Sequence, residues 1–195
     1  MRASIVIPSL NSPILDQVLA AVLSQDEIET VAEILVVGQD EPGLIGRTEK
    51  TRLIDPGVRL YPPAARNLGI QRSLSPLLIF LDSDCIPQAG WLRAHSAAHA
   101  AGHPVVGGSV LPAGGNYWSK VYNLGMFHEY LTMQDDGSRR ILPTLNLSVE
   151  REVIQNVGLL DEALVRAQDL EWSTRFRAAG FPLHFSAAAA VLHSH

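Results

Sequence analysis

The stretch LLIFLDSDC, residues Leu77 to Cys85, decides the fold. Its five apolar residues predict a buried strand, and two aspartates separated by one serine follow directly. In an extended segment, side chains two residues apart point to the same side, so we expect Asp82 and Asp84 to lie together. Two such carboxylates repel each other and lose hydration, and no basic residue stands beside them in sequence. A bound divalent cation would compensate both effects, but taken alone the pattern is more typical of a solvated turn or cap.

Apolar runs like this one alternate with segments of helical pattern along the chain. We expect strands over 3–7, 32–37, 52–54, 77–81, 105–110, 181–185 and 188–192, and an edge strand over 145–149. We expect helices from the cap at 11–13 to 25, and over 64–73, 88–101, 150–156 and 166–179. Strands that are apolar throughout indicate an α/β fold with a mainly parallel sheet covered on both faces. Ligands bind at the carboxyl ends of such strands, where the two aspartates stand.

The composition indicates a single globular domain over residues 1–195. Apolar residues make up 47% and charged residues 18% of the chain, and the formal net charge is −5. These values argue against a disordered chain and against a nucleic-acid-binding protein. Cys85 is the only cysteine, which fits a reducing cytoplasm. No apolar run approaches the ~20 residues that a membrane span needs, so we expect a soluble or peripherally attached protein.

The segment around the two aspartates resembles the metal-binding region of nucleotide-sugar glycosyltransferases of the GT-A fold. The resemblance to family 2 glycosyltransferases extends along nearly the whole chain. It rests on seven further segments that follow the family in order and spacing: SIVIPSLN (4–11), AVLSQ (21–25), EILVVGQDEPG (33–43), PPAARNLGI (62–70), VVGGSV (105–110), LPTLNLSVEREVIQNVGLLDEAL (142–164) and AQDLEWSTRFRAAGF (167–181).

The resemblance implies a fold, a reaction and a location. The fold is a GT-A domain with one mainly parallel central sheet flanked by helices, residues 1–110 forming a nucleotide-binding half and 111–195 an acceptor-binding half. The reaction is the metal-dependent, inverting transfer of a hexose from a nucleoside diphosphate sugar to a hydroxyl of a saccharide or lipid-linked acceptor. The expected location is the cytoplasm, with peripheral contact to the inner face of the membrane left open.

The resemblance also implies which residues contact the donor. The expected donor-contacting residues are Pro8, Asn11, Asp40, Arg66, Asn67, Asp82 and Asn146. One departure affects the base: many family members have two adjacent aspartates where Gly38 and Gln39 stand here. Asp40 takes over the base contact if the loop is shifted by a residue or two; otherwise base recognition differs.

The expected metal ligands are Asp84, Asp82 and His193, and the expected metal is Mn²⁺ or Mg²⁺. Imidazole suits Mn²⁺ better than Mg²⁺, so His193 favours manganese, and His195 is an alternative to it. Asp169 corresponds to the family's catalytic base, which takes a proton from the acceptor hydroxyl.

Several alternatives to these assignments remain open at this point. Glu171 is the alternative catalytic base, although on a helix it and Asp169 do not face the same way. His95, His99 and His103 recur every four residues, and a solvated helix face is the preferred interpretation of that pattern. For the aromatic segment 117–130 we favour core packing over an acceptor wall or a membrane-facing surface.

Two other functions compete with the transferase. The first is a catalytically silent module that binds a nucleotide sugar. The second is a sugar nucleotidyltransferase, which the sequence disfavours because PSLNSPILD, residues 8–16, contains neither glycine nor lysine.

Overall fold

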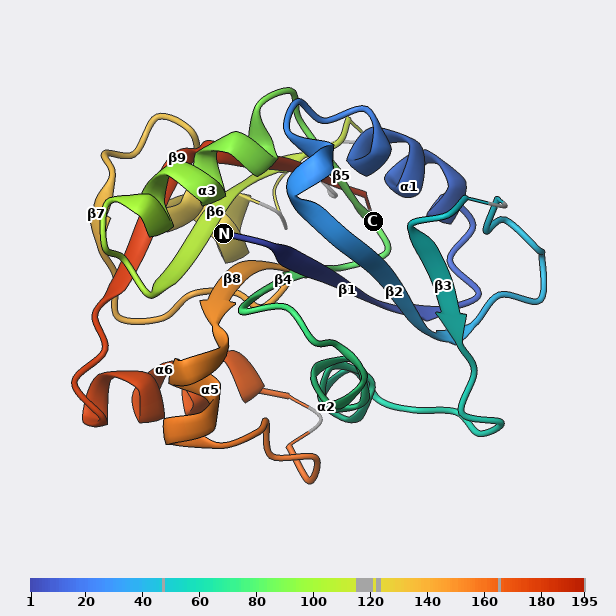
Figure 1. The fold of residues 1–195 in the computed structure, drawn as a ribbon. Coiled ribbons are helices and arrows are strands. Elements are labelled where there is room, and N and C mark those ends of the chain that lie inside the picture. Colours follow the sequence, from blue (N-terminus) through green and yellow to red (C-terminus); the bar gives the residue numbers. More distant parts are fainter. Residues whose placement is uncertain (47, 115–120, 122–123, 165, 195) are drawn as a thin grey trace.

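A computed structural model describes residues 1–46, 48–114, 121, 124–164 and 166–194. Figure 1 shows one sheet running through the molecule with helices on both faces. The strands are β1 Ala3–Leu10, β2 Val31–Gln39, β3 Thr51–Ile54, β4 Leu77–Leu81, β5 Cys85–Pro87, β6 Val105–Pro112, β7 Gly137–Ser138, β8 Asn146–Glu150 and β9 Leu183–His193. The helices are α1 Leu15–Leu23, α2 Pro62–Arg72, α3 Trp91–Ala100, α5 Arg151–Val157 and α6 Gln168–Ala178, with short 3₁₀ turns η1 Ile28–Thr30 and η2 His128–Tyr130.

The sheet has a parallel half and a mixed half. Its spatial order is β3-β2-β1-β4-β8-β6-β9-β5, with β7 paired to β9. The first four strands in this order are mutually parallel, whereas β8 is antiparallel to both β4 and β6. The α/β fold class expected from the sequence is confirmed, and antiparallel pairs enter only in the half of the sheet beyond β4.

Three details of the predicted strands differ from the structure. The segment expected as an edge strand, β8, lies inside the sheet between β4 and β6. Its polar residues Asn146 and Ser148 suggested a face in water, but both are buried. The two late strands form one long strand, β9, whose register with β6 shifts between Gly108 and Val110. The short strand β5, directly after the two aspartates, was not expected.

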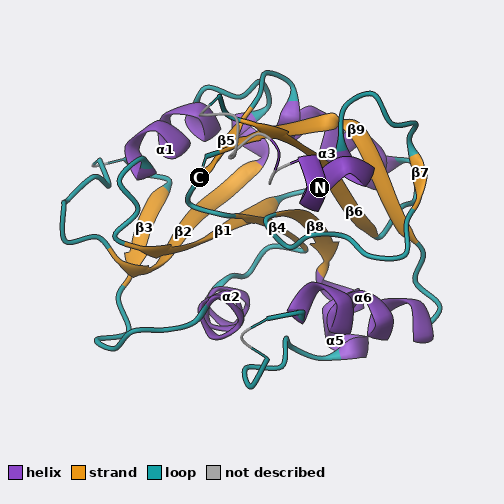
Figure 2. Cartoon of the chain, turned by 180° about the vertical axis from the view of Figure 1, so that it is seen from behind, coloured by secondary structure: helices purple, strands orange, loops and turns teal. Residues whose placement is uncertain are grey.

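The helices cover the sheet in two layers. Figures 1 and 2 show α1 and α3 on one face and α2, α5 and α6 on the other. Helix α2 approaches β1 very closely, because a Cβ at Gly69 would lie 2.3 Å from a methyl carbon of Val6. On the same face, Trp172 of α6 makes an edge contact with Phe80 of β4, with ring centroids 5.7 Å apart. These contacts fix α2 against β1 and α6 against β4.

A buried polar network joins α3 to β8, and it contradicts the solvated helix face expected for the histidines. His95 contacts the Ser148 hydroxyl at 2.8 Å and the Asn146 side-chain oxygen at 3.1 Å. The Nε2 of His99 lies 2.7 Å from the same hydroxyl, and the indole N–H of Trp91 donates to Asn146. The Ser148 hydroxyl and the Asn146 amide provide hydrogen-bond partners for these ring nitrogens, so the histidines can be buried. The four-residue spacing therefore marks a buried polar contact between α3 and β8 and not a face of the helix in solvent.

The third histidine of the series lies elsewhere. His103 follows the end of α3 and stacks on His184 of β9, with ring centroids 3.7 Å apart.

In the part of the chain that the structure describes, no helix combines the length and the apolarity required to cross a membrane.

The buried network predicts an acid-sensitive fold. Burial lowers the pKa of His95 to about 4, below its ordinary value of 6.5. Because the unfolded chain takes up the proton first, stability is full above pH 6.5 and falls as the pH drops toward 4. One pKa unit corresponds to ~1.4 kcal/mol, so His95 alone should lower the free energy of unfolding by roughly 2 to 3 kcal/mol between pH 7.5 and 4.5.

Urea unfolding at these two pH values measures the effect. In His95→Gln the fall should be smaller by about the same 2 to 3 kcal/mol, since the titrating group is gone. The exposed His128 provides a control, His128→Gln, that should behave like the wild type. An equal fall in the wild type and in His95→Gln would contradict the prediction.

Candidate active site

A cavity of about 700 Å³ opens at the carboxyl edge of the parallel half of the sheet. Its walls come from the turn after β1, the end of β2, the loop before α2, the segment after β4 and the end of the chain. The lining residues are Pro8 to Leu10, Ser12 to Ile14, Val37, Arg59 to Pro62, Ala65, Asp82 to Asp84 and Ser194.

The two aspartates line this cavity but have different partners. Asp82 accepts a 2.5 Å hydrogen bond from the guanidinium of Arg66, and an Oδ of Asp84 lies 3.6 Å from Nε2 of His193. The backbone turns between them, with the N–H of Cys85 donating to the carbonyl of Asp82. Arg66, 16 residues earlier, thus supplies a positive charge that the neighbouring sequence lacks.

Arg66 is the most deeply buried charge of the site. Its side chain is 1% exposed, and its Nε and Nη1 groups make no hydrogen bond within the described part of the chain. Burial raises the pKa of Asp82, Arg66 lowers it, and the charges of Asp84 and Asp169 raise it further; the net shift is upward. Asp169 therefore lies close enough to Asp82 to act on it electrostatically.

Asp84, Cys85 and His193 form a candidate metal centre. One potential ligand atom from each lies within 4.8 Å of the others. The pairing of β5 with β9 brings them together, because Cys85 stands opposite His193 in the register. Burial raises the pKa of Asp84, but the His193 imidazole together with hydrogen bonds from Cys85 and the backbone outweighs it and the net shift is downward, so the carboxylate is ionised at neutral pH.

The donor set fits a divalent cation of intermediate hardness. A carboxylate oxygen and an imidazole nitrogen suit Mn²⁺. Burial and the two neighbouring carboxylates raise the pKa of the Cys85 thiol well above its usual value, so it stays protonated at neutral pH. The thiol consequently adds little to metal binding, and Asp84 and His193 are the candidate ligands.

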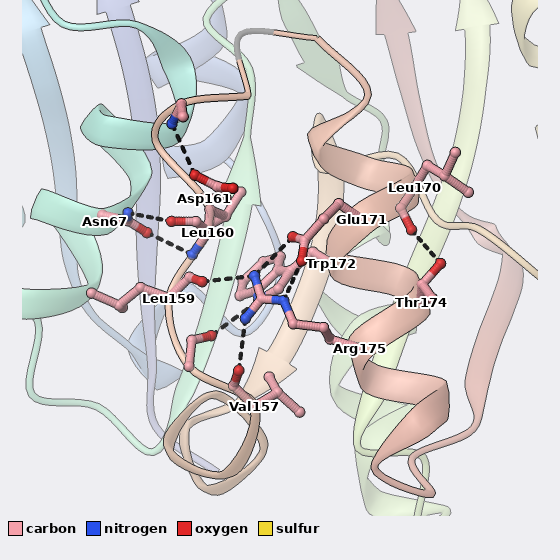
Figure 3. A network of polar contacts seen from close by, with 12 residues as sticks. Asn67, Val157, Leu159, Leu160, Asp161, Leu170, Glu171, Trp172, Thr174 and Arg175 are labelled. Atoms are coloured by element: carbon pink, nitrogen blue, oxygen red, sulfur yellow. Dashed lines mark hydrogen bonds and ion pairs between the residues drawn. The ribbon is translucent and has the colours of Figure 1, made fainter.

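Asp169 lies in the first turn of α6, where the helix dipole favours a carboxylate. Its Oδ1 accepts hydrogen bonds from the backbone N–H of Thr144 at 3.2 Å and from the Thr144 hydroxyl at 2.7 Å. Its Oδ2 has no hydrogen-bond partner among the described residues. Glu171, the alternative base, is held by Arg175 in contacts of 2.6 and 2.8 Å (Figure 3). Asp169 is therefore the better placed of the two.

Two expected donor-contacting residues are buried away from the cavity. The amide of Asn67 is hydrogen-bonded to the backbone of Leu160 and to the carboxylate of Glu162. Asn146 is fully buried, and its amide joins the network with His95. Both side chains serve packing between elements, a role that a motif in sequence does not distinguish from ligand contact.

The expected base-contacting residues are divided between cavity and loop. Pro8 lines the cavity. Asn11, at φ 58°, accepts a hydrogen bond from the backbone of Glu41 and so ties the loop after β1 to the loop after β2. Asp40 accepts hydrogen bonds from the backbone N–H groups of Leu44 and Ile45 and does not line the cavity.

Gly38 explains why no aspartate stands at this position near the end of β2. Its φ is +131°, and a Cβ there would lie 2.0 Å from the carbonyl oxygen of Ser9 in the paired strand β1. No side chain fits this position while β1 and β2 remain paired. The absence of an aspartate at position 38 is therefore required by the backbone of the paired strands and is not only a change of side chain.

Sequence reasoning missed the cavity residues that come from loops. Arg59 and Tyr61 line the cavity from the loop before α2, and the Ser12 hydroxyl donates to the carbonyl of Ser83. For Arg59 and Tyr61, the available signal was the place of both residues shortly before Pro62, in a loop at the carboxyl edge of the sheet. His195, the alternative to His193, and much of the aromatic segment 117–130 lie outside the described residues.

Comparison with known proteins agrees with this geometry. The family model for glycosyl transferase family 2 matches residues 4–158. Glycosyltransferase AglE of Haloferax volcanii is 31% identical over 193 residues, which cover 94% of this chain and 64% of that protein. The pre-mycofactocin glycosyltransferase of Mycobacterium tuberculosis is 26% identical over 147 residues, covering 69% of this chain and 30% of that protein. The chain thus spans less than two thirds of the length of either relative.

Solved structures share the fold. GalNAc-T7, crystallised with UDP, GalNAc and Mn²⁺, superposes with a TM-score of 0.77 at 17% identity, covering 100% of this chain and 44% of that one. TarS of S. aureus gives a TM-score of 0.77 at 14% identity, covering 100% of this chain and 37% of that one. The resemblance seen in the sequence is confirmed, and the chain belongs to glycosyltransferase family 2 and has the GT-A fold.

Proposed function

We propose that this chain catalyses the metal-dependent, inverting transfer of a sugar from a nucleoside diphosphate sugar to an acceptor hydroxyl. One observation carries the proposal: Asp82 and Asp84 line one cavity, the imidazole of His193 lies 3.6 Å from Asp84 behind its wall, and Asp169 lies within electrostatic range of Asp82. Two carboxylates with an imidazole suit a cation–diphosphate pair, and a further carboxylate suits a general base. The relatives named glycosyltransferases support the same reaction class.

The donor is proposed to occupy the cavity at the carboxyl edge. Except for Ser194, the lining residues lie between positions 8 and 84, within the nucleotide-binding half 1–110. Asp169 and its partner Thr144 belong to the acceptor-binding half, 111–195. The solved GalNAc-T7, with UDP and Mn²⁺, supports a nucleotide donor and a divalent cation for a fold of this kind.

Asp84 and His193 would hold Mn²⁺ or Mg²⁺, with Asp82 beside them. When bound, such a cation neutralises charge on the departing diphosphate. Arg66 fixes Asp82 at the cavity wall and opposes the rise of its pKa on burial, and the carboxylate is proposed to accept hydrogen bonds from the donor ribose. The protein's own contribution at this end is therefore orientation of the donor.

Asp169 is proposed to act as the base. Thr144 holds Oδ1, so Oδ2 accepts the proton of the acceptor hydroxyl. The acceptor oxygen forms its bond to the anomeric carbon as the bond from that carbon to the diphosphate oxygen breaks. Attack opposite the leaving group inverts the anomeric configuration, and the electron pair leaves with the nucleoside diphosphate.

Asp84→Ala tests the metal assignment. The substitution removes a carboxylate ligand, so Mn²⁺-dependent binding of UDP should weaken by roughly 100-fold or more. Titration calorimetry with UDP, with and without Mn²⁺, measures this. Asp26→Ala, which removes a carboxylate from an exposed ion pair with Arg93, is the control and should bind as the wild type does. Unchanged Mn²⁺-dependent binding in Asp84→Ala would refute the assignment.

Asp169→Asn tests the base. The amide keeps the shape of the carboxylate but cannot take a proton, so turnover should fall by about 10²- to 10⁴-fold while Mn²⁺-dependent UDP binding is retained. Turnover is measured as release of nucleotide from UDP-glucose, UDP-N-acetylglucosamine and GDP-mannose, with water as the acceptor. The exposed Glu152 on α5 supplies the control Glu152→Gln. Full turnover in Asp169→Asn would exclude it as the base.

A silent nucleotide-sugar-binding module is the second candidate. The orientation of Asp40 into its own loop and the side-chain-free position at Gly38 favour it, because the expected base contact is missing. The two functions differ in one measurement. Mn²⁺-dependent UDP binding without release of nucleotide from any of the three donors would favour the module.

A further inference from the structure

One loop, residues 157–162, lies between α2 and α6 and is anchored to both (Figure 3). On the α2 side, the buried Asn67 donates to the carbonyl of Leu160 at 2.9 Å and accepts from its N–H at 3.0 Å. The same amide nitrogen donates to Glu162 at 2.8 Å. Asn67 thus uses both ends of its amide on this loop, and it is 2% exposed.

On the α6 side, Arg175 holds the same loop. Its guanidinium donates to the carbonyl of Val157 at 2.6 Å and to that of Leu159 at 2.8 Å. Glu171, one turn earlier on α6, contacts the guanidinium with both carboxylate oxygens and fixes its orientation. The carbonyl of Val157 ends α5 and would otherwise lack a helical partner.

A third contact ties this arrangement to the central sheet. The indole N–H of Trp172 donates to the carbonyl of Gly158 at 3.1 Å, and its ring packs against Phe80 of β4. Carbonyls of consecutive residues 157–160 are therefore bound by side chains from two helices. A loop without regular structure is made rigid in this way, because its backbone groups have fixed partners.

The anchored loop connects the two chemical ends of the site. On α2, Asn67 follows Arg66, which donates a hydrogen bond to Asp82. On α6, Asp169 lies two residues before Glu171, the partner of Arg175. We propose that Asn67 and Arg175 are positioning residues that hold the loop 157–162 and so set the distance from Asp169 to the carboxylates after β4. This role rests on the proposed function, in which Asp169 is the base.

The role predicts a specific kinetic defect. A base displaced by about 1 Å lowers the rate of the chemical step by roughly 100-fold, whereas the donor contacts are unaffected. Asn67→Ala should therefore lower kcat for nucleotide release by between about 10-fold and 100-fold and leave KM within about twofold. The substrate is whichever of UDP-glucose, UDP-N-acetylglucosamine and GDP-mannose the wild type hydrolyses fastest in Mn²⁺.

Hydrogen exchange provides a readout that does not depend on activity. In Asn67→Ala, peptides that cover residues 157–169 should exchange faster, and those that cover β4 should not change. Arg175→Lys is the second variant, useful if Asn67→Ala folds poorly: it keeps the charge opposite Glu171 but cannot bridge two carbonyls in a planar fork. It should show the same two changes. Thr174→Val is the control, because this exposed hydroxyl bonds only within α6, to Leu170.

Each outcome decides a separate point. Unchanged exchange over 157–169 in both variants overturns the anchoring, and faster exchange with unchanged kcat overturns the positioning role. A parallel rise in KM and fall in kcat points to general loss of structure and also overturns it. A wild type that releases nucleotide from none of the donors overturns the proposed function and the positioning role with it, whereas the exchange data still decide whether the loop is anchored.

Discussion

The ion pair between Arg66 and Asp82 is the contact on which the site depends. A guanidinium that is 1% exposed is costly to bury unless a carboxylate neutralises it, and the carboxylate is costly to crowd beside Asp84 without a cation. The carboxylate of Asp82 thus offsets the cost of burying the Arg66 guanidinium, and the guanidinium offsets the repulsion between Asp82 and Asp84. The pair requires α2 to lie directly under the end of β4, and Gly69 permits this by letting the helix approach β1. The position of Asp82 in the cavity wall follows from this ion pair.

Three carboxylates share the field of this site, and each has its own partner. Arg66 accompanies Asp82, His193 accompanies Asp84, and Thr144 accompanies Asp169. A guanidinium, an imidazole and a hydroxyl differ in charge, so the three acids have different environments although they lie near one another. This separation is what a site needs if one acid is to bind a cation and another is to accept a proton.

The sequence predicted local structure and motif position well, and side-chain partners poorly. The strand 77–81 and its aspartates were found because apolar runs and turns are local signals. The pairing of Arg66 with Asp82 spans 16 residues, and periodicity carries no information about such contacts. The burial of His95 against Ser148 was missed for a related reason. Each of these residues is polar, so each taken alone indicates solvent, and only their meeting across α3 and β8 makes burial favourable.

The close approach of β1 to β2 at Gly38 limits how the cavity can change. Val37, which lines the cavity, directly precedes Gly38, and with no room for a Cβ at Gly38 the end of β2 cannot gain a further side chain at that position. A change in the chemistry of the cavity is easier where side chains already line it from a loop, and Arg59 and Tyr61 line it from a loop that no strand pairing constrains. Divergence of ligand preference in this lineage would therefore be recorded in the 59–61 loop rather than in the sheet.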